Sequence, residues 1–159
     1  MDKVFITIFC GVTVYILGQI LLKMFIDPVA DLKKSISQVQ YNLVKFSHIL
    51  FNSDVFGQEK LDEIFLELRS LSADLLAKTS IIPCYDFTSC IFRLPKINNI
   101  RKASTNLIAL GNWISMKDHP AKIGHVIKNL QELFENLNLE IEDKDKIDEE
   151  TLKALINKQ

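Results

Sequence analysis

The sequence predicts an all-α protein: an N-terminal single transmembrane helix followed by an antiparallel helical bundle of about four helices. Three observations support this fold class. The chain begins with a long uncharged run, apolar residues then recur at helical spacing, and helix breakers are scarce, with 5 glycines and 4 prolines among 159 residues. Such a composition favours long helices over a turn-rich β fold. We divide the chain into an anchor (1–26), a helical bundle domain (27–139) and an acidic tail (140–159) with a short terminal helix.

The anchor is the nineteen-residue stretch from Val4 to Leu22, which contains no charged residue. A helix rises about 1.5 Å per residue, so this stretch nearly spans the ~30 Å hydrocarbon core of a bilayer. A cleaved signal peptide and a buried core helix are the alternatives. A signal peptide usually has a basic start and small residues before its cleavage point. Here only Lys3 precedes the run and no A-x-A pattern follows it, so we predict an uncleaved anchor.

The flanking charges predict the orientation of this anchor. Lys3 lies on its N-terminal side, whereas Lys23, Lys33 and Lys34 follow it. Basic residues favour the cytoplasmic side, so we expect the N-terminus outside and the bundle in the cytoplasm. The three cysteines (Cys10, Cys84 and Cys90) agree with this orientation, since an odd count without close spacing suits a reducing compartment. We expect the latter two to be buried thiols.

One face of the anchor carries small residues. Thr7, Gly11, Val14 and Gly18 are spaced by four, three and four residues, and Gln19 follows. Small residues on a shared face let two helices approach closely in lipid. This face therefore predicts self-association of the anchor into a homo-oligomer. The alternative is that Gly and Thr are simply tolerated in a membrane helix.

Asp27-Pro28 predicts the start of the first bundle helix, because Asp is a good N-cap and Pro suits the first helical position. A kinked continuation of the anchor is the alternative. Apolar residues then alternate at spacings of three and four, which is the seam of a bundle helix. This seam consists of Val29, Leu32, Ile36, Val39, Leu43, Phe46 and Leu50.

Three further long helices are expected at about 58–79, 98–115 and 120–137. Between them lies IIPCYDFTSCIFRLP (81–95), an aromatic-rich piece bracketed by two prolines. We predict a short helix or packed connector whose large side chains plug the core. Asp148 is expected to cap the last short helix of the tail.

Charge is unevenly distributed along the chain, although the net charge is only −1. Residues 91–130 contain seven basic residues and one acidic residue, a net charge of +6. Either neighbouring acidic helices neutralise this segment, or it faces the anionic headgroups of the bilayer. The predicted basic face consists of Arg93, Lys96, Arg101, Lys102, Lys117, Lys122 and Lys128.

No arrangement of residues predicts catalysis. His48, His119 and His125 are not at helical ligand spacing, and Cys84 and Cys90 match neither a zinc nor a redox motif. The serines lie outside any G-x-S-x-G elbow, and the glycines form no phosphate loop. We therefore expect no enzyme activity, no metal and no cofactor. The basic segment lacks a nucleic-acid reader motif, so we expect no nucleic-acid partner.

Two function classes remain. The first is a membrane-anchored, non-enzymatic interaction or scaffold module, with the lipid bilayer and a protein of unknown identity as partners. The second is a membrane-tethered small-molecule or lipid sensor with an apolar pocket between bundle helices. The residues expected to line that pocket are Tyr85, Phe87, Phe92 and Trp113.

Four features stand out together: the Gly-Gln-containing anchor, Pro28, the IIPCYDF connector and the ASTNLIALGNWI helix. In these features the chain resembles small N-terminally anchored bacterial membrane proteins of no assigned function. The likeness covers roughly residues 15–115 and excludes the acidic tail. It implies an anchored helical protein of the bacterial inner membrane. It implies no activity and no functional residues.

The orientation can be tested with a cysteine placed in residues 140–159 of a variant that lacks the three native cysteines. We expect this cysteine to resist a membrane-impermeant thiol reagent in intact cells and to react after permeabilisation. Labelling in intact cells would place the tail outside and contradict the predicted orientation.

Overall fold

The computed structural model describes residues 2–52, 55–116 and 122–139, and within these ranges the chain is helical without a strand. The all-α prediction is confirmed for this part of the chain. The terminal helix expected after Asp148 lies outside the described residues.

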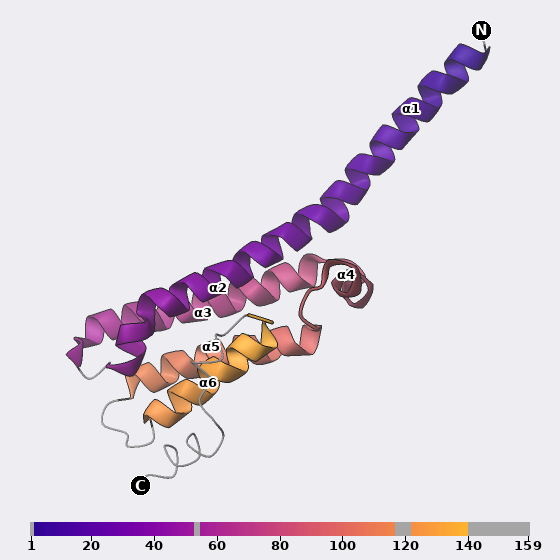
Figure 1. Cartoon of the computed structure of the whole chain (residues 1–159). Coiled ribbons are helices and arrows are strands. Elements are labelled where there is room, and N and C mark those ends of the chain that lie inside the picture. The colour runs from indigo at the N-terminus through magenta and orange to yellow at the C-terminus, as the bar shows by residue number, and fades with distance from the viewer. Residues whose placement is uncertain (1, 53–54, 117–121, 140–159) are drawn as a thin grey trace.

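The first helix is continuous from the apolar N-terminal segment into the bundle (Figure 1). It comprises α1 (Asp2–Leu21), the π-helical turn η1 (Leu22–Ile26) and α2 (Asp27–Phe51). In this turn the Asp27 N–H bonds to the Leu22 carbonyl, five residues earlier. Pro28 explains the wide turn, because proline lacks an N–H and its ring crowds the carbonyl four residues before it. As expected, α2 begins at Asp27 and Pro28 lies in its first turn. Asp27 is not its N-cap, however, because Ile26 before it is already helical and the helix runs on from α1, which is the continuation given as the alternative.

The side chains of α1 project away from the rest of the chain. Phe5 is 72% exposed and Val14 is 70% exposed. By length and composition this helix can cross a membrane. Buried apolar side chains begin only at Val29, where α2 joins the bundle.

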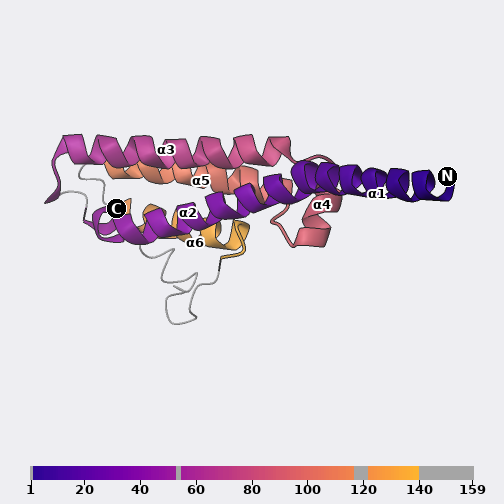
Figure 2. The ribbon, with the colours of Figure 1, turned by 90° about the horizontal axis from the view of Figure 1, so that it is seen from above.

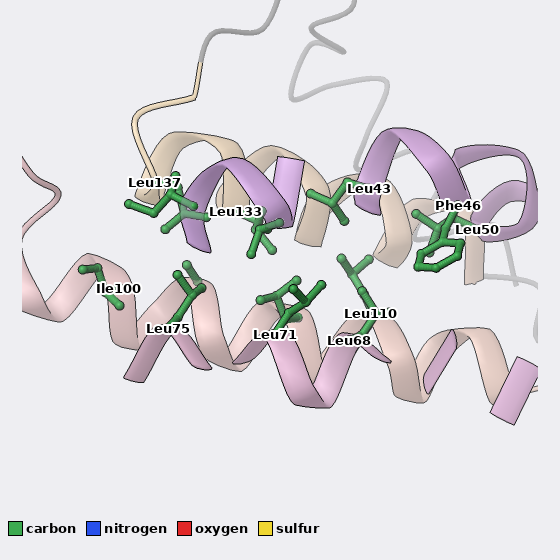
Figure 3. Close-up of a cluster of buried hydrophobic side chains, with 14 of the residues drawn as sticks. Leu43, Phe46, Leu50, Leu68, Leu71, Leu75, Ile100, Leu110, Leu133 and Leu137 are labelled. Atoms are coloured by element: carbon green, nitrogen blue, oxygen red, sulfur yellow. The ribbon is translucent and has the colours of Figure 1, made fainter. Parts of the chain in front are cut away.

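The bundle consists of α2, α3 (Gln58–Ile81), α5 (Ile97–Ser115) and α6 (Lys122–Asn136), which lie side by side (Figures 1 and 2). The most extensive packing joins α3 to α5, followed by α5 to α6 and α2 to α3. All seven residues of the predicted α2 seam are buried. Figure 3 shows Leu43, Phe46 and Leu50 of this seam facing leucines of the other helices.

Small residues bring α3 and α5 close together. A Cβ atom at Gly111 would lie 3.0 Å from Cδ2 of Phe65, so this glycine lets the aromatic ring rest on the α5 backbone. Further along the same interface, the hydroxyls of Ser72 and Ser104 are 2.6 Å apart and both residues are buried. One hydroxyl donates to the other, and the Ser104 carbonyl, 3.1 Å from Ser72 Oγ, can accept the second proton, so the contact tolerates burial of two polar groups.

The connector between α3 and α5 forms the short helix α4 (Tyr85–Phe92) at one end of the bundle (Figure 1). It begins after Cys84 and ends at Arg93, and both residues are left-handed, with φ of 47° and 53°. The prediction that its large side chains plug the core is wrong for Phe87 and Ile91, which are 67% and 57% exposed. Tyr85 is buried.

The burial of the α2 seam predicts that substitutions at adjacent positions of α2 differ sharply in their effect on stability. We expect Leu43→Asp to lower the free energy of unfolding by more than about 3 kcal/mol, because losing a buried leucine costs about 2–5 kcal/mol and an unpaired buried charge adds to that cost. Leu43 is 3% exposed, whereas the neighbouring Val44 is 67% exposed. Val44→Asp should therefore change stability by less than about 0.5 kcal/mol. Denaturant unfolding of the full-length protein in detergent micelles, followed by circular dichroism, measures both. Similar effects of the two variants would contradict the assigned seam.

Candidate functional surface where the apolar helix meets the bundle

Hydrogen bonds to the backbone carbonyls of the two flanking prolines hold α4 in its orientation. The Tyr85 hydroxyl donates to the Pro95 carbonyl at 2.7 Å, and the Thr88 hydroxyl donates to the Pro83 carbonyl at 3.0 Å. Burial, followed by the nearby Asp86 carboxylate, raises the pKa of Tyr85 to about 12. The phenol therefore stays protonated and remains a donor at neutral pH.

An apolar groove separates α4 from the end of the first apolar segment. Its volume is about 280 Å³. Both walls are formed by large apolar side chains, which come from α1 and η1 on one side and from α4 on the other. These side chains are Leu21, Phe25 and Ile26, and Phe87, Ile91 and Phe92.

The structure does not assemble the pocket that the sequence predicted. Phe87 and Phe92 line the apolar groove, whereas Tyr85, the first residue of α4, is buried. Trp113 instead stacks on His125, with ring centroids 4.2 Å apart and planes 6° apart. Trp113 is sixteen residues after Ile97, the first residue of α5. It therefore lies about 24 Å along this helix from the end of the bundle that carries α4. The α1 and η1 residues of the groove were missed, because nothing in the sequence indicates that α4 folds back beside them.

The predicted basic residues are divided between the two ends of the bundle. Arg93, Lys96, Arg101 and Lys102 are exposed at the end that carries α4. Lys122, at the start of α6, is 6% exposed, so its assignment to an exposed face is wrong. Lys128 lies 3.9 Å from Glu132 and is half exposed. The position of Lys117 lies outside the described residues.

The small-residue face of α1 is open along its length. Thr7, Val14 and Gln19 are exposed, and a Cβ atom at Gly11 or Gly18 would meet nothing within 4 Å. The Thr7 hydroxyl donates to the Lys3 carbonyl at 2.9 Å, a bond within the same helix. Self-association through this face stays a prediction.

A polar cluster joins α2 to α3 near the same end of the bundle. The Ser35 hydroxyl donates to Oδ2 of Asp74 at 2.5 Å and accepts from Nζ of Lys78 at 2.5 Å. Lys78 also lies 2.8 Å from the same carboxylate oxygen. Because Ser35 is only 1% exposed, its hydroxyl serves the helix contact and is not accessible for attack on a substrate. The sequence did not predict this cluster, because the i, i+4 spacing of Asp74 and Lys78 indicates an ion pair on one helix but not its contact with Ser35.

The pKa of Asp74 reflects two opposing causes. Burial raises it, but the hydrogen bonds from Lys78 and Ser35 and the charge of Lys78 together hold it below the ordinary value of 3.8. The carboxylate is therefore ionised at neutral pH, and the cluster contributes stability in its charged form.

The cysteines do not behave as buried structural thiols. Cys84 and Cys90 are both exposed and free, so the expectation that they are buried is wrong. In the described ranges no group of three or more His, Cys, Asp or Glu residues is placed to hold a metal ion.

Comparison of the chain with protein families, with curated proteins and with solved structures finds no match. The groove, the basic residues and the polar cluster are therefore interpreted from their own chemistry.

The polar cluster predicts a pH-dependent effect of Ser35→Ala. At neutral pH we expect a loss of about 1 kcal/mol, the usual net value of a hydrogen bond, with partial screening because Asp74 is partly exposed. The Asp74 carboxyl has a lower pKa in the folded protein, so it stabilises the fold at pH values above its pKa in the unfolded chain. This contribution disappears as the pH falls through the folded pKa. The difference from the parent should therefore shrink below the ordinary value of 3.8. Thermal unfolding at neutral pH and at about pH 3 measures it.

The matched control for this prediction is Ser37→Ala, at an exposed position on the same helix. It should leave stability unchanged at both pH values. An equal loss in both serine variants, or a loss from Ser35→Ala that persists in acid, would contradict the stabilising role of the cluster.

Proposed function

We propose that this protein is a single-pass, membrane-anchored helical interaction or scaffold module, without enzyme activity, at the inner face of the bacterial cell membrane. The observation that carries the proposal is the continuous helix from Lys3 to Phe51. One half of it is apolar and exposed, and the other half supplies the buried seam of the bundle. A helix without a flexible link transmits position and orientation, so a protein bound to the bundle is held at a defined place relative to the bilayer.

The packing of the bundle supports a role for its outer surface. Leucines from α2, α3, α5 and α6 fill the interior (Figure 3). In the described part of the chain, every buried side-chain nitrogen or oxygen has a hydrogen-bond partner. Two large apolar side chains nevertheless face outward on α2, where Tyr41 and Val44 are three residues apart and are each 67% exposed. Apolar side chains that share one exposed face can form the contact point for a protein partner, whereas singly scattered ones are common on any protein surface.

The alternative function, a small-molecule or lipid sensor with an apolar pocket between the bundle helices, has less support. Its proposed lining residues are distributed over separate environments, and the apolar groove opens beside α1 and η1, outside the bundle interior.

The proposal predicts that partner capture requires both the anchor and the rigid connection. In-cell crosslinking and pull-down of the full-length protein should recover a partner at the membrane. A form that lacks residues 1–26 should lose most of it. A third form, with Gly-Gly-Ser inserted between Ile26 and Asp27, keeps the anchor and the bundle but interrupts the helix. It should stay in the membrane fraction and capture less partner, because bundle orientation is no longer transmitted.

Two results would contradict this function. Equal capture by the form without residues 1–26 would show that tethering is unnecessary. Release of the full-length protein from membranes by alkaline extraction would show that the apolar helix is not an integral anchor.

A further inference from the structure

The position of α4 along the first helix is set by its contact with residues 21–26. The uncharged stretch of nineteen residues from Val4 to Leu22 spans about 28 Å, which nearly fills the ~30 Å hydrocarbon core. In the proposed anchor, Lys23 therefore lies at the boundary between acyl chains and headgroups. Because Leu21, Phe25 and Ile26 form one wall of the apolar groove, the other wall, α4, lies at the same depth.

The exposed side of α4 carries two large apolar side chains beside Asp86 and Cys90, whereas a helix on a water-exposed surface usually turns such side chains inward. Phe87 and Ile91 are four residues apart, share this face and are 67% and 57% exposed. Tyr85 and Thr88 form the buried side. Another exposed apolar side chain is that of Ile81 at the end of α3, which is 65% exposed. The apolar side chains of α1 and η1 thus adjoin those of α4 at the groove, where the ribbon of α4 lies at the end of the bundle from which α1 projects (Figure 1).

Charged groups flank this apolar surface. Lys23 precedes the groove residues of η1, and Arg93 and Lys96 follow α4, all exposed. Two exposed acidic residues also adjoin the groove residues in sequence: Asp86, which precedes Phe87, and Asp27, which follows Ile26. An apolar face bordered by basic residues is the pattern of a helix that lies in the plane of a membrane interface.

We propose that α4 is an interfacial membrane helix: Phe87 and Ile91 insert between the lipids of the inner leaflet beside the anchor, and Arg93 and Lys96 lie at the level of the phosphates. The inference rests on the proposed anchor and deepens it by naming the bilayer interface as the partner of this surface. Continuity with the apolar surface of α1 favours lipid over a protein occupant. The continuous helix fixes the distance and tilt of the bundle relative to the bilayer but leaves rotation about the helix axis free, whereas a second membrane contact also fixes which face of the bundle points into the cytoplasm.

The test uses the full-length protein in vesicles of phosphatidylcholine and phosphatidylglycerol at a high ratio of lipid to protein. In a background without the native cysteines, a single cysteine carries a spin label at position 87, 66 or 14. Leu66 is the matched control, since it is 64% exposed but lies on α3. Val14 reports on the anchor. Collisions with oxygen and with a water-soluble nickel chelate give the depth of each label.

We expect the label at position 87 to lie about 5–10 Å inside the boundary, shielded from the nickel chelate and accessible to oxygen. The label at position 66 should remain in water, and the label at position 14 should lie deepest. If the label at position 87 is as accessible to nickel as the label at position 66, the interfacial helix is refuted while a buried label at position 14 leaves the anchor intact. If position 14 is also accessible, the proposed function fails with it.

A protein occupant gives a different result. Shielding at position 87 from both reagents that disappears when the protein is diluted with lipid would show that a second copy covers α4, and would overturn the proposal.

A substitution test provides a second measurement. Phe87→Asp combined with Ile91→Asp changes only exposed side chains, so helicity should be retained, and a label on Cys90 should move from shielded to nickel-accessible. Leu66→Asp should leave the Cys90 label shielded. An unchanged Cys90 label in the double variant would overturn the proposal.

Discussion

The structure depends on backbone continuity at Pro28. A proline inside a helix removes one hydrogen bond and crowds the preceding turn, which commonly ends or kinks the helix. Here the chain widens into η1, and the Asp27 N–H reaches the Leu22 carbonyl. The π-helical turn lets the helix pass the proline and changes its direction at the point where exposed apolar side chains give way to buried ones (Figure 1). The direction in which the bundle leaves α1 follows from this turn.

The second constraint is the folding back of α4 toward that turn. Left-handed residues at both ends, Cys84 and Arg93, turn the chain into and out of α4 within a short segment. The Tyr85 hydroxyl then binds the Pro95 carbonyl and holds the helix in place. This arrangement places apolar side chains from distant parts of the sequence on either side of one groove. On the neighbouring side, the Ser35, Asp74 and Lys78 cluster joins α2 to α3 and stabilises the same end of the bundle.

The sequence predicted burial correctly where apolar residues repeat at helical spacing. It predicted burial wrongly for single residues outside such a repeat. The seam from Val29 to Leu50 is buried throughout, because the spacing of three and four places every member on one helical face. Composition alone assigned Phe87 to the core and Cys90 to a buried site, and both are exposed. Lys122 was placed on an open basic face and is buried. Residue type predicts average burial, whereas the turns that flank α4 and the packing of the first residues of α6 set the burial of these individual side chains.

By itself the sequence determined that the chain is helical and that its first helix is apolar and long enough to cross a membrane. It also determined which face of α2 is buried. These properties are local, because they depend on residue spacing within one helix. Only the tertiary structure decided that the helix continues through Pro28, that Ser35 meets Asp74 and Lys78, and that α4 lies beside Phe25 and Ile26. The Ser35 cluster and the position of α4 bring together groups that are far apart in the chain. The passage through Pro28 depends on a backbone conformation that the residue types alone do not specify. Their positions follow from the packing of the whole bundle.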